Sequence, residues 1–180
     1  MPRLLLAVLT GLIGAALLHI IIILALPHFT GSDAYTRVMA EGPINRFHPL
    51  DDSPDEAGLV NMDPYLKVAV CHFDTSSQAL RLLARGGTRF WSLAIYDADS
   101  NEVFSMNDRT SVDGTLDLLL ASPLQLTRLR KTLPAVLAQS ILVEMPRRTG
   151  YAVLRTMVPQ ASFEETAEEF LRGALCVPFL

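Results

Sequence analysis

The stretch LLLAVLTGLIGAALLHIIIILAL, from Leu4 to Leu26, divides the chain into two parts that need different surroundings. It contains no charged residue, and only Thr10 and His19 interrupt its apolar character. As an α-helix it would be about 34 Å long at ~1.5 Å per residue, slightly more than the ~30 Å hydrocarbon core of a bilayer. We therefore expect residues 1–27 to form a single transmembrane anchor.

A cleaved signal peptide is the alternative reading of an apolar N-terminal stretch. Arg3 supplies a charged start, but a signal peptide has an apolar region of ~7–15 residues followed by a cleavage site of small residues. Here the apolar stretch ends in Leu-Ala-Leu-Pro-His, without small residues at positions −3 and −1. Ser32 and Ala34 have suitable sizes but lie too far from the apolar end. We therefore interpret the helix as a retained anchor.

Charged residues at the two ends of the stretch indicate its orientation. Arg3 and the α-amino group stand before it, whereas Arg37, the nearest base after it, lies between Asp33 and Glu41. The positive-inside rule then favours a cytoplasmic N-terminus. In a bacterium this predicts an inner-membrane protein whose C-terminal domain is periplasmic.

The rest of the chain has the composition of an ordinary folded protein. A length of 180 residues suits one domain plus appendages. All 19 acidic residues and all but one of the 15 basic residues follow Leu26, so this part is mildly acidic. Nucleic-acid binding, which needs a basic face, is therefore not expected, and no polybasic segment is present for anionic lipid.

Residues 28–61 are expected to connect the anchor to the domain. Apolar side chains recur at roughly helical spacing in its first part: Phe29, Tyr35, Val38 and Met39. With Ser32 or Asp33 as N-cap, this pattern favours a short amphipathic segment on the membrane surface. Four prolines between residues 43 and 64 exclude regular helix there, and an acidic cluster accompanies them: Asp51, Asp52, Asp55 and Glu56. An extended connector is predicted.

A β-rich domain is predicted for residues 62–180. The expected strands are Leu66–Asp74, Leu80–Arg85, Phe90–Asp97, Val103–Met106, Leu116–Leu120, Ile141–Met145 and Tyr151–Val158. Residues 146–150 predict a hairpin between the last two strands. Capping-box patterns at Ser122–Gln125 and Ser162–Glu165 predict helices over Pro123–Thr132 and up to about Leu175. Strands and helices in these numbers indicate an α+β or β-sandwich-like domain.

The apolar helix carries a face of small residues that would let another helix approach closely. Its members are Ala7, Gly11, Gly14, Ala15 and Leu18, with His19 near the edge of the face. Small residues favour helix association in lipid, although a helix that is simply apolar could carry them by chance. An imidazole in hydrocarbon needs a partner. His19 could hydrogen-bond a neighbouring helix or a carbonyl, ligate a haem or chlorophyll-type metal, or reach interfacial water.

Cys71 and Cys176 are the two cysteines of the chain. Exported cysteine pairs tend to be oxidised, which favours a disulfide. Two separately buried thiols, acting as small apolar side chains, are the alternative, and the sequence leaves both open.

No motif for catalysis or metal binding stands out. The patterns G-x-S-x-G and H-E-x-x-H do not occur, and Cys71 and His72, adjacent on a strand, point to opposite faces. A hydrolase would need His72, Asp74 and Ser105 to meet across strands. The calcium-loop-like residues are Asp97, Asp99, Asn101 and Asp108, but Glu102 takes the position that requires glycine. We expect no catalytic residue, no metal and no cofactor.

Several strand motifs resemble a known family. They are Asp63-Pro64, AVCHFD at 69–74, FWSLAIYD at 90–97 and FSMNDR at 104–109, followed by Glu144, GYAVLR at 150–155, Val158-Pro159 and Ala174-Leu175-Cys176. These residues are similar to those of the family catalogued as domain of unknown function 1254, and specifically to its short membrane-anchored alphaproteobacterial branch. The resemblance implies an antiparallel, sandwich-like sheet and names no activity. The family's larger secreted members add a second β domain, which this chain lacks.

The expected function is that of a non-enzymatic accessory subunit of a respiratory, photosynthetic or transport complex. Its helix would dock on other transmembrane helices in the bilayer, and its domain would cap or bridge them. The alternatives are a tethered periplasmic domain for ligand binding or envelope maintenance and, third, a hydrolase.

Overall fold

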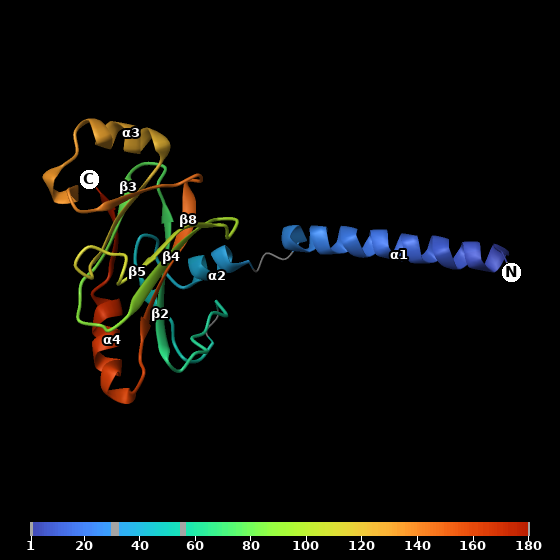
Figure 1. Ribbon diagram of the computed structural model, residues 1–180, viewed down its shortest axis with the longest axis horizontal. Coiled ribbons are helices and arrows are strands. Elements are labelled where there is room, and N and C mark those ends of the chain that lie inside the picture. Colours follow the sequence, from blue (N-terminus) through green and yellow to red (C-terminus); the bar gives the residue numbers. More distant parts are fainter. Residues whose placement is uncertain (1, 30–32, 55–56, 180) are drawn as a thin grey trace.

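The computed structural model describes residues 2–29, 33–54 and 57–179 of the chain. It contains one long helix, α1 (Pro2–Phe29), and a β domain of two layers (Figure 1). Helix α1 is long and apolar enough to cross a membrane, and a signal sequence meets the same criteria of length and composition.

Nine strands of the described residues form two sheets. The five-stranded sheet has the order β1 (His48–Pro49), β2 (Leu66–Asp74), β8 (Thr149–Met157), β4 (Trp91–Asp97) and β5 (Glu102–Asn107). The four-stranded sheet has the order β7 (Ile141–Glu144), β6 (Leu116–Ala121), β3 (Ala79–Ala84) and β9 (Leu175–Phe179). Neighbouring strands are antiparallel except β6 and β7, which run parallel. The predicted fold class, a small sandwich-like domain after an apolar helix, is confirmed.

The core lies between the two sheets and follows from the period-2 pattern of the strands. On β2, Cys71 and Phe73 point into the main core, whereas Val70 and His72 point to the opposite face. Trp91 is 1% exposed, and its indole Nε1 donates to the carbonyl of Gly114 over 2.9 Å. This bond satisfies the single polar atom of the ring, so the largest side chain of the core is buried without an unpaired donor.

Helix α3 (Pro123–Lys131) begins as its capping box predicts. Ser122 Oγ accepts from the Gln125 amide, and Gln125 Oε1 accepts from the Ser122 amide over 2.8 Å. A second interaction extends this cap, because Gln125 Nε2 donates to the carbonyl of Thr75 over 3.0 Å. Leu126 anchors the helix on the outer face of the four-stranded sheet, against Leu119.

The second predicted capping box is wrong. Helix α4 (Glu164–Arg172) follows a 3₁₀ turn, η2 (Ala161–Phe163), and no side chain caps its N-terminus. Ser162 Oγ instead accepts from Gln160 Nε2. The helix also ends at Arg172 rather than near Leu175, because the following residues pair with β3 as strand β9. Local pattern could not reveal this pairing, which joins segments almost a hundred residues apart.

The predicted hairpin between residues 141–145 and 151–158 is also wrong. Strand β7 lies beside β6 in the four-stranded sheet, whereas β8 lies between β2 and β4 in the five-stranded sheet. The intervening residues cross from one layer to the other, and Met145 is buried at this crossing. At the start of β8, a Cβ on Gly150 would overlap with the carbonyl oxygen of Tyr96. Glycine therefore permits close pairing with β4 instead of forming a turn.

Helix α2 (Ala34–Ala40) corrects the expectation of an amphipathic segment on the membrane surface. Its N-cap is Asp33, whose side chain accepts from the Thr36 amide over 2.8 Å; Ser32, the other candidate, lies outside the described residues. Val38 is 3% exposed and packs against Val70 and Tyr151 on the outer face of the five-stranded sheet. The apolar side of α2 therefore covers the domain.

The connector also contributes to the folded domain. Strand β1 pairs with β2, and Phe47, directly before β1, is 5% exposed in the main core. Between Pro43 and Pro64 no helix forms in the described residues, as the prolines there predict. The packed unit thus includes residues from Asp33 onward and begins before Met62.

Candidate functional site

The small-residue face of α1 is open in this chain. Ala7, Gly11, Gly14, Ala15, Leu18 and His19 are all exposed. A Cβ at Gly11 or Gly14 would meet no other atom within 4 Å, apart from the helix's own backbone. Thr10 Oγ1 donates to the carbonyl of Leu6 over 2.8 Å, so this hydroxyl is paired within the helix. That this face binds another helix stays a prediction.

Cys71 and Cys176 are joined in a disulfide. Both are buried, Cys71 in β2 and Cys176 in β9, so the bond crosses the core between the two sheets. It is a structural cross-link without solvent access, and neither sulfur is available as a nucleophile or metal ligand.

The three residues that a hydrolase would need do not come together. Ser105 lies on β5, which two strands separate from β2, the strand that carries His72 and Asp74. Three strand spacings of ~4.8 Å place Ser105 some 14 Å away, too far for a hydrogen bond. Ser105 instead donates to Glu102, and Asp74 accepts from the amide of Ser76.

His72 is the most unusual polar residue of the domain. It is 6% exposed, and its Nδ1 has no hydrogen-bond partner among the described residues. Burial, together with the nearby charge of His48, lowers the pKa of His72 below its ordinary value. The buried Oδ1 of Asn45 also has no partner within the described ranges, and the Asn45 amide donates to the carbonyl of His72 over 3.0 Å. Burial of His72 beneath the segment that follows α2 therefore favours the neutral imidazole.

The residues resembling a calcium loop form a turn instead. The carboxylate of Asp97 accepts from the amides of Asp99 and Asn101 and from the Asn101 side chain. Burial raises the pKa of Asp97, but these hydrogen bonds and the charge of Arg147 outweigh burial and lower it overall. Asp108 lies at the other end of β4, where its amide bonds to Trp91. Within the described ranges, no cluster of three or more His, Cys, Asp or Glu side chains could hold a metal.

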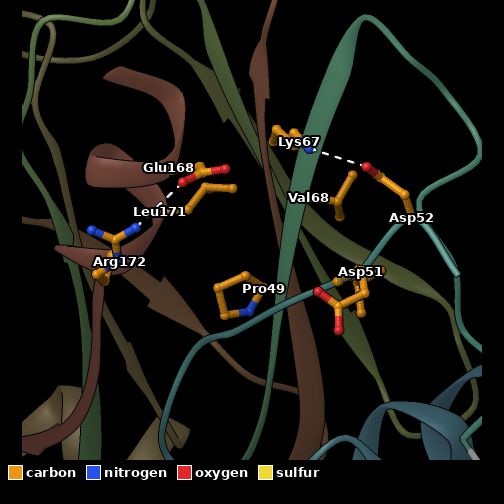
Figure 2. Close-up of a pocket in the computed structure, with 9 residues that line it drawn as sticks. Pro49, Asp51, Asp52, Lys67, Val68, Glu168, Leu171 and Arg172 are labelled. Carbon is orange, nitrogen blue, oxygen red and sulfur yellow. Dashed lines mark hydrogen bonds and ion pairs between the residues drawn. The ribbon is translucent and has the colours of Figure 1, made fainter. Parts of the chain in front are cut away.

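Two grooves on either side of Lys67 are concave features that sequence reasoning missed. The first, of about 280 Å³, lies between β1, β2 and α4 (Figure 2). Its lining residues are Pro49, Leu50, Asp51, Asp52, Lys67, Val68, Glu168, Leu171 and Arg172. The second, of about 510 Å³, shares Asp52 and Lys67 with the first and continues along the connector and the segment before α4.

An ion-pair bridge separates the two grooves. Lys67 Nζ lies 3.3 Å from Asp52 Oδ2 and 3.3 Å from Glu164 Oε1. Burial lowers the pKa of Lys67, but its two carboxylate partners outweigh this effect and raise it. Asn61 holds Asp52 in position for this bridge, because its Nδ2 donates to Asp52 Oδ1 and to the carbonyl of Leu66. The arrangement places one positive and two negative charges where the two grooves meet.

Sequence signals for these grooves were incomplete. Asp51 and Asp52 stood out as part of an acidic cluster, but Lys67 reads as an ordinary strand residue and Glu164 as part of a helix start. Three segments far apart in the chain supply the bridge, so no local spacing could predict it.

Comparisons with known proteins agree with this fold. A family model described as "Protein of unknown function (DUF1254)" matches residues 44–178. The crystal structure of the VPA0106 protein from Vibrio parahaemolyticus is similar at a TM-score of 0.56 and 13% identity, over 80% of this chain and 33% of that chain. A crystal structure of an uncharacterized protein from Burkholderia cenocepacia matches at a TM-score of 0.43 and 15% identity, over 71% of this chain and 37% of that chain.

The likeness to the Vibrio parahaemolyticus protein concerns the fold alone. The chain spans about a third of the length of each of the two solved proteins. Among curated proteins, none matches it. Because the family model covers the β domain from just before β1 to within β9, the chain belongs to the DUF1254 family of proteins of unknown function.

Proposed function

We propose that this protein is a non-enzymatic, single-pass subunit of a larger membrane assembly. Helix α1 docks on other transmembrane helices, and the domain caps or bridges them on the exported side of a bacterial inner membrane. Respiratory, photosynthetic and transport assemblies all have helices that such a subunit could contact. Within its family we assign the chain to the short membrane-anchored alphaproteobacterial branch.

The observation that carries this proposal is the exposure of helix α1. The membrane-spanning window of the helix is 0% buried in the described chain, and its two glycines face open space. Helices in lipid associate through close packing and polar contacts, because lipid offers no hydrophobic drive between them. The Gly11–Ala15 face allows such packing, and His19 has a ring that gains from a partner.

The exported side is supported by the disulfide. Disulfides persist in oxidising compartments and are rare in the cytosol. A bond between Cys71 and Cys176 inside the core therefore favours a domain that folds beyond the membrane, in agreement with the charges around α1.

The test adds volume to the open helix face. Gly11→Leu with Ala15→Leu, in the tagged full-length protein, should release the partner helices during purification in mild detergent, while the membrane level of the protein stays normal. Ala16→Leu is the matched control, because it makes the same change about 100° around the helix from Ala15, away from the small-residue face. Wild-type partner ratios in the Gly11→Leu, Ala15→Leu variant would show that attachment does not use α1.

A tethered binding domain is the second candidate, and the grooves beside Lys67 favour it. In that case the α1 variant should keep full function in cells. Lys67→Gln, which removes the bridge between Asp52 and Glu164, should instead reproduce the loss seen on deleting the protein.

A further inference from the structure

The two ends of the sandwich carry opposite charges. Helix α3 lies at one end and α4 at the other (Figure 1). Between Asp117 and Glu144 the chain has no acidic residue, and the last turn of α3 contains three bases: Arg128, Arg130 and Lys131. Helix α4, by contrast, carries four glutamates: Glu164, Glu165, Glu168 and Glu169. The two helices at the ends of the domain therefore carry charges of opposite sign.

The basic end also exposes apolar side chains. We define the basic patch as Leu124, Arg128, Arg130, Lys131 and Leu133. Leu124, Arg128 and Lys131 follow one another at helical spacing on the side of α3 opposite the buried Leu126. Leu124 is 61% and Leu133 45% exposed, so apolar and positive groups share one surface.

The acidic end combines exposed apolar side chains with negative charges. We define the acidic groove as the larger groove beside Lys67, of about 510 Å³, together with the exposed Glu165 and Glu169 of α4. Its apolar wall includes Met62 and Tyr65, which are 85% and 63% exposed. Asp52 and Glu164 line its floor around the single positive charge of Lys67.

We propose that the basic patch of one copy of this protein binds the acidic groove of a second copy. Each surface places exposed apolar side chains next to charges of predominantly one sign, positive in the basic patch and negative around Lys67 in the acidic groove. Apolar contacts would supply the area, whereas the charges would fix the orientation and exclude like ends. Because the two surfaces differ and lie at opposite ends of the domain, the contact is head-to-tail and can repeat into a row.

Such a row is compatible with membrane anchoring. Helix α2 packs midway along β2 and β8, on the outer face of the five-stranded sheet and away from both ends of the domain (Figure 1). Only four residues of the sequence stand between the end of α1 and the start of α2, so the anchor begins close in the chain to the side of the domain that α2 covers. All copies in a row could therefore insert into the same membrane. Helix α3 packs on the opposite sheet from α2, which favours a protein over the lipid surface as the occupant of the basic patch.

The test measures the mass of the full-length protein in mild detergent by sedimentation. The wild type should associate at low salt and dissociate at 1 M NaCl, where the Debye length falls to about 3 Å. Arg128→Glu with Lys131→Glu should raise the dissociation constant at least about tenfold, and so should Glu165→Lys with Glu169→Lys. An equimolar mixture of these two variants should associate again, because one variant keeps an intact acidic groove and the other keeps an intact basic patch.

Two controls distinguish this contact from a general effect of net charge and from helix docking. Arg85→Glu with Arg109→Glu changes the net charge as Arg128→Glu with Lys131→Glu does, at exposed sites outside both surfaces, and should associate as the wild type does. The Gly11→Leu, Ala15→Leu variant should also associate, so the outcome is independent of the proposed helix docking. A monomeric wild type at low salt, failure of the mixture to associate, or loss of association in the α1 variant would each overturn the proposal. So would a monomer whose binding to phosphatidylglycerol vesicles depends on Arg128 and Lys131.

Discussion

The disulfide between Cys71 and Cys176 joins the two layers of the sandwich. Cys71 belongs to β2 of the five-stranded sheet and Cys176 to β9, the edge of the four-stranded sheet, with their Cα atoms 6.7 Å apart. The bond spans 105 residues of sequence, and β9 is the last strand of the chain. It therefore fixes the C-terminal strand to the first long strand across the core.

Removal of this bond should destabilise the domain. For a loop of this length, the chain-entropy model gives about 4–5 kcal/mol of stabilisation. Cys71→Ala with Cys176→Ala should lower the free energy of unfolding by roughly this amount in urea denaturation. Reductant should bring the wild type to the level of the variant and leave the variant unchanged. Free alkylation of both cysteines in protein isolated without reductant would contradict the prediction.

The exported location of the domain can be tested by a reporter fusion. Arg3 lies before the apolar stretch, whereas Arg37 after it lies between two acidic residues, so the positive-inside rule predicts a cytoplasmic N-terminus. A reporter active only in the periplasm should then be active when fused after Leu180. The fusion should stay in the membrane fraction at full length, since α1 is expected to be retained. Signal from a cytoplasm-specific reporter at the same site would reverse the orientation, and release of a shortened protein would identify α1 as a signal sequence.

Gly150→Ala should weaken the pairing of β8 with β4. A Cβ at this position would overlap with the Tyr96 carbonyl oxygen, which belongs to the backbone of β4, and would approach Cζ of the buried Phe73 at 3.0 Å. Overpacking of this kind costs about 1–3 kcal/mol, which thermal denaturation would measure. Gly87→Ala is the matched control, because a Cβ there meets nothing within 4 Å. Equal melting temperatures for the two variants would show that the sheet adjusts freely at Gly150.

His72 should make the domain less stable in mild acid. Its pKa in the folded state is lowered from 6.5, mainly by burial and also by the charge of His48. The unfolded chain therefore binds a proton more readily, and the free energy of unfolding should fall as the pH drops below about 6.5. His72→Gln, which cannot titrate, should show a smaller fall between pH 7 and pH 5 in urea denaturation. Parallel pH profiles of the two proteins would rule out this role.

Local pattern was enough to predict many elements of the fold. The predicted strand Leu66–Asp74 has the same bounds as β2. Most other strands in the domain begin and end within a residue or two of their predicted bounds. The capping box of Ser122 and Gln125 was correct for the same reason, because its hydrogen bonds join neighbours in the sequence. The candidate site was less predictable, because Asp52, Lys67 and Glu164 meet only through folding.

The sequence by itself determined that an apolar helix precedes a sandwich-like domain of alternating strands. Hydropathy and period-2 alternation are summed over neighbouring residues, so they can be read without knowing what each segment touches. Only the tertiary structure decided which strands pair, that β7 and β8 belong to different sheets, and that Cys71 lies opposite Cys176. Strand partners and cross-links depend on contacts between residues distant in the chain. Their geometry is fixed when the two sheets pack, and no local spacing in the sequence encodes it.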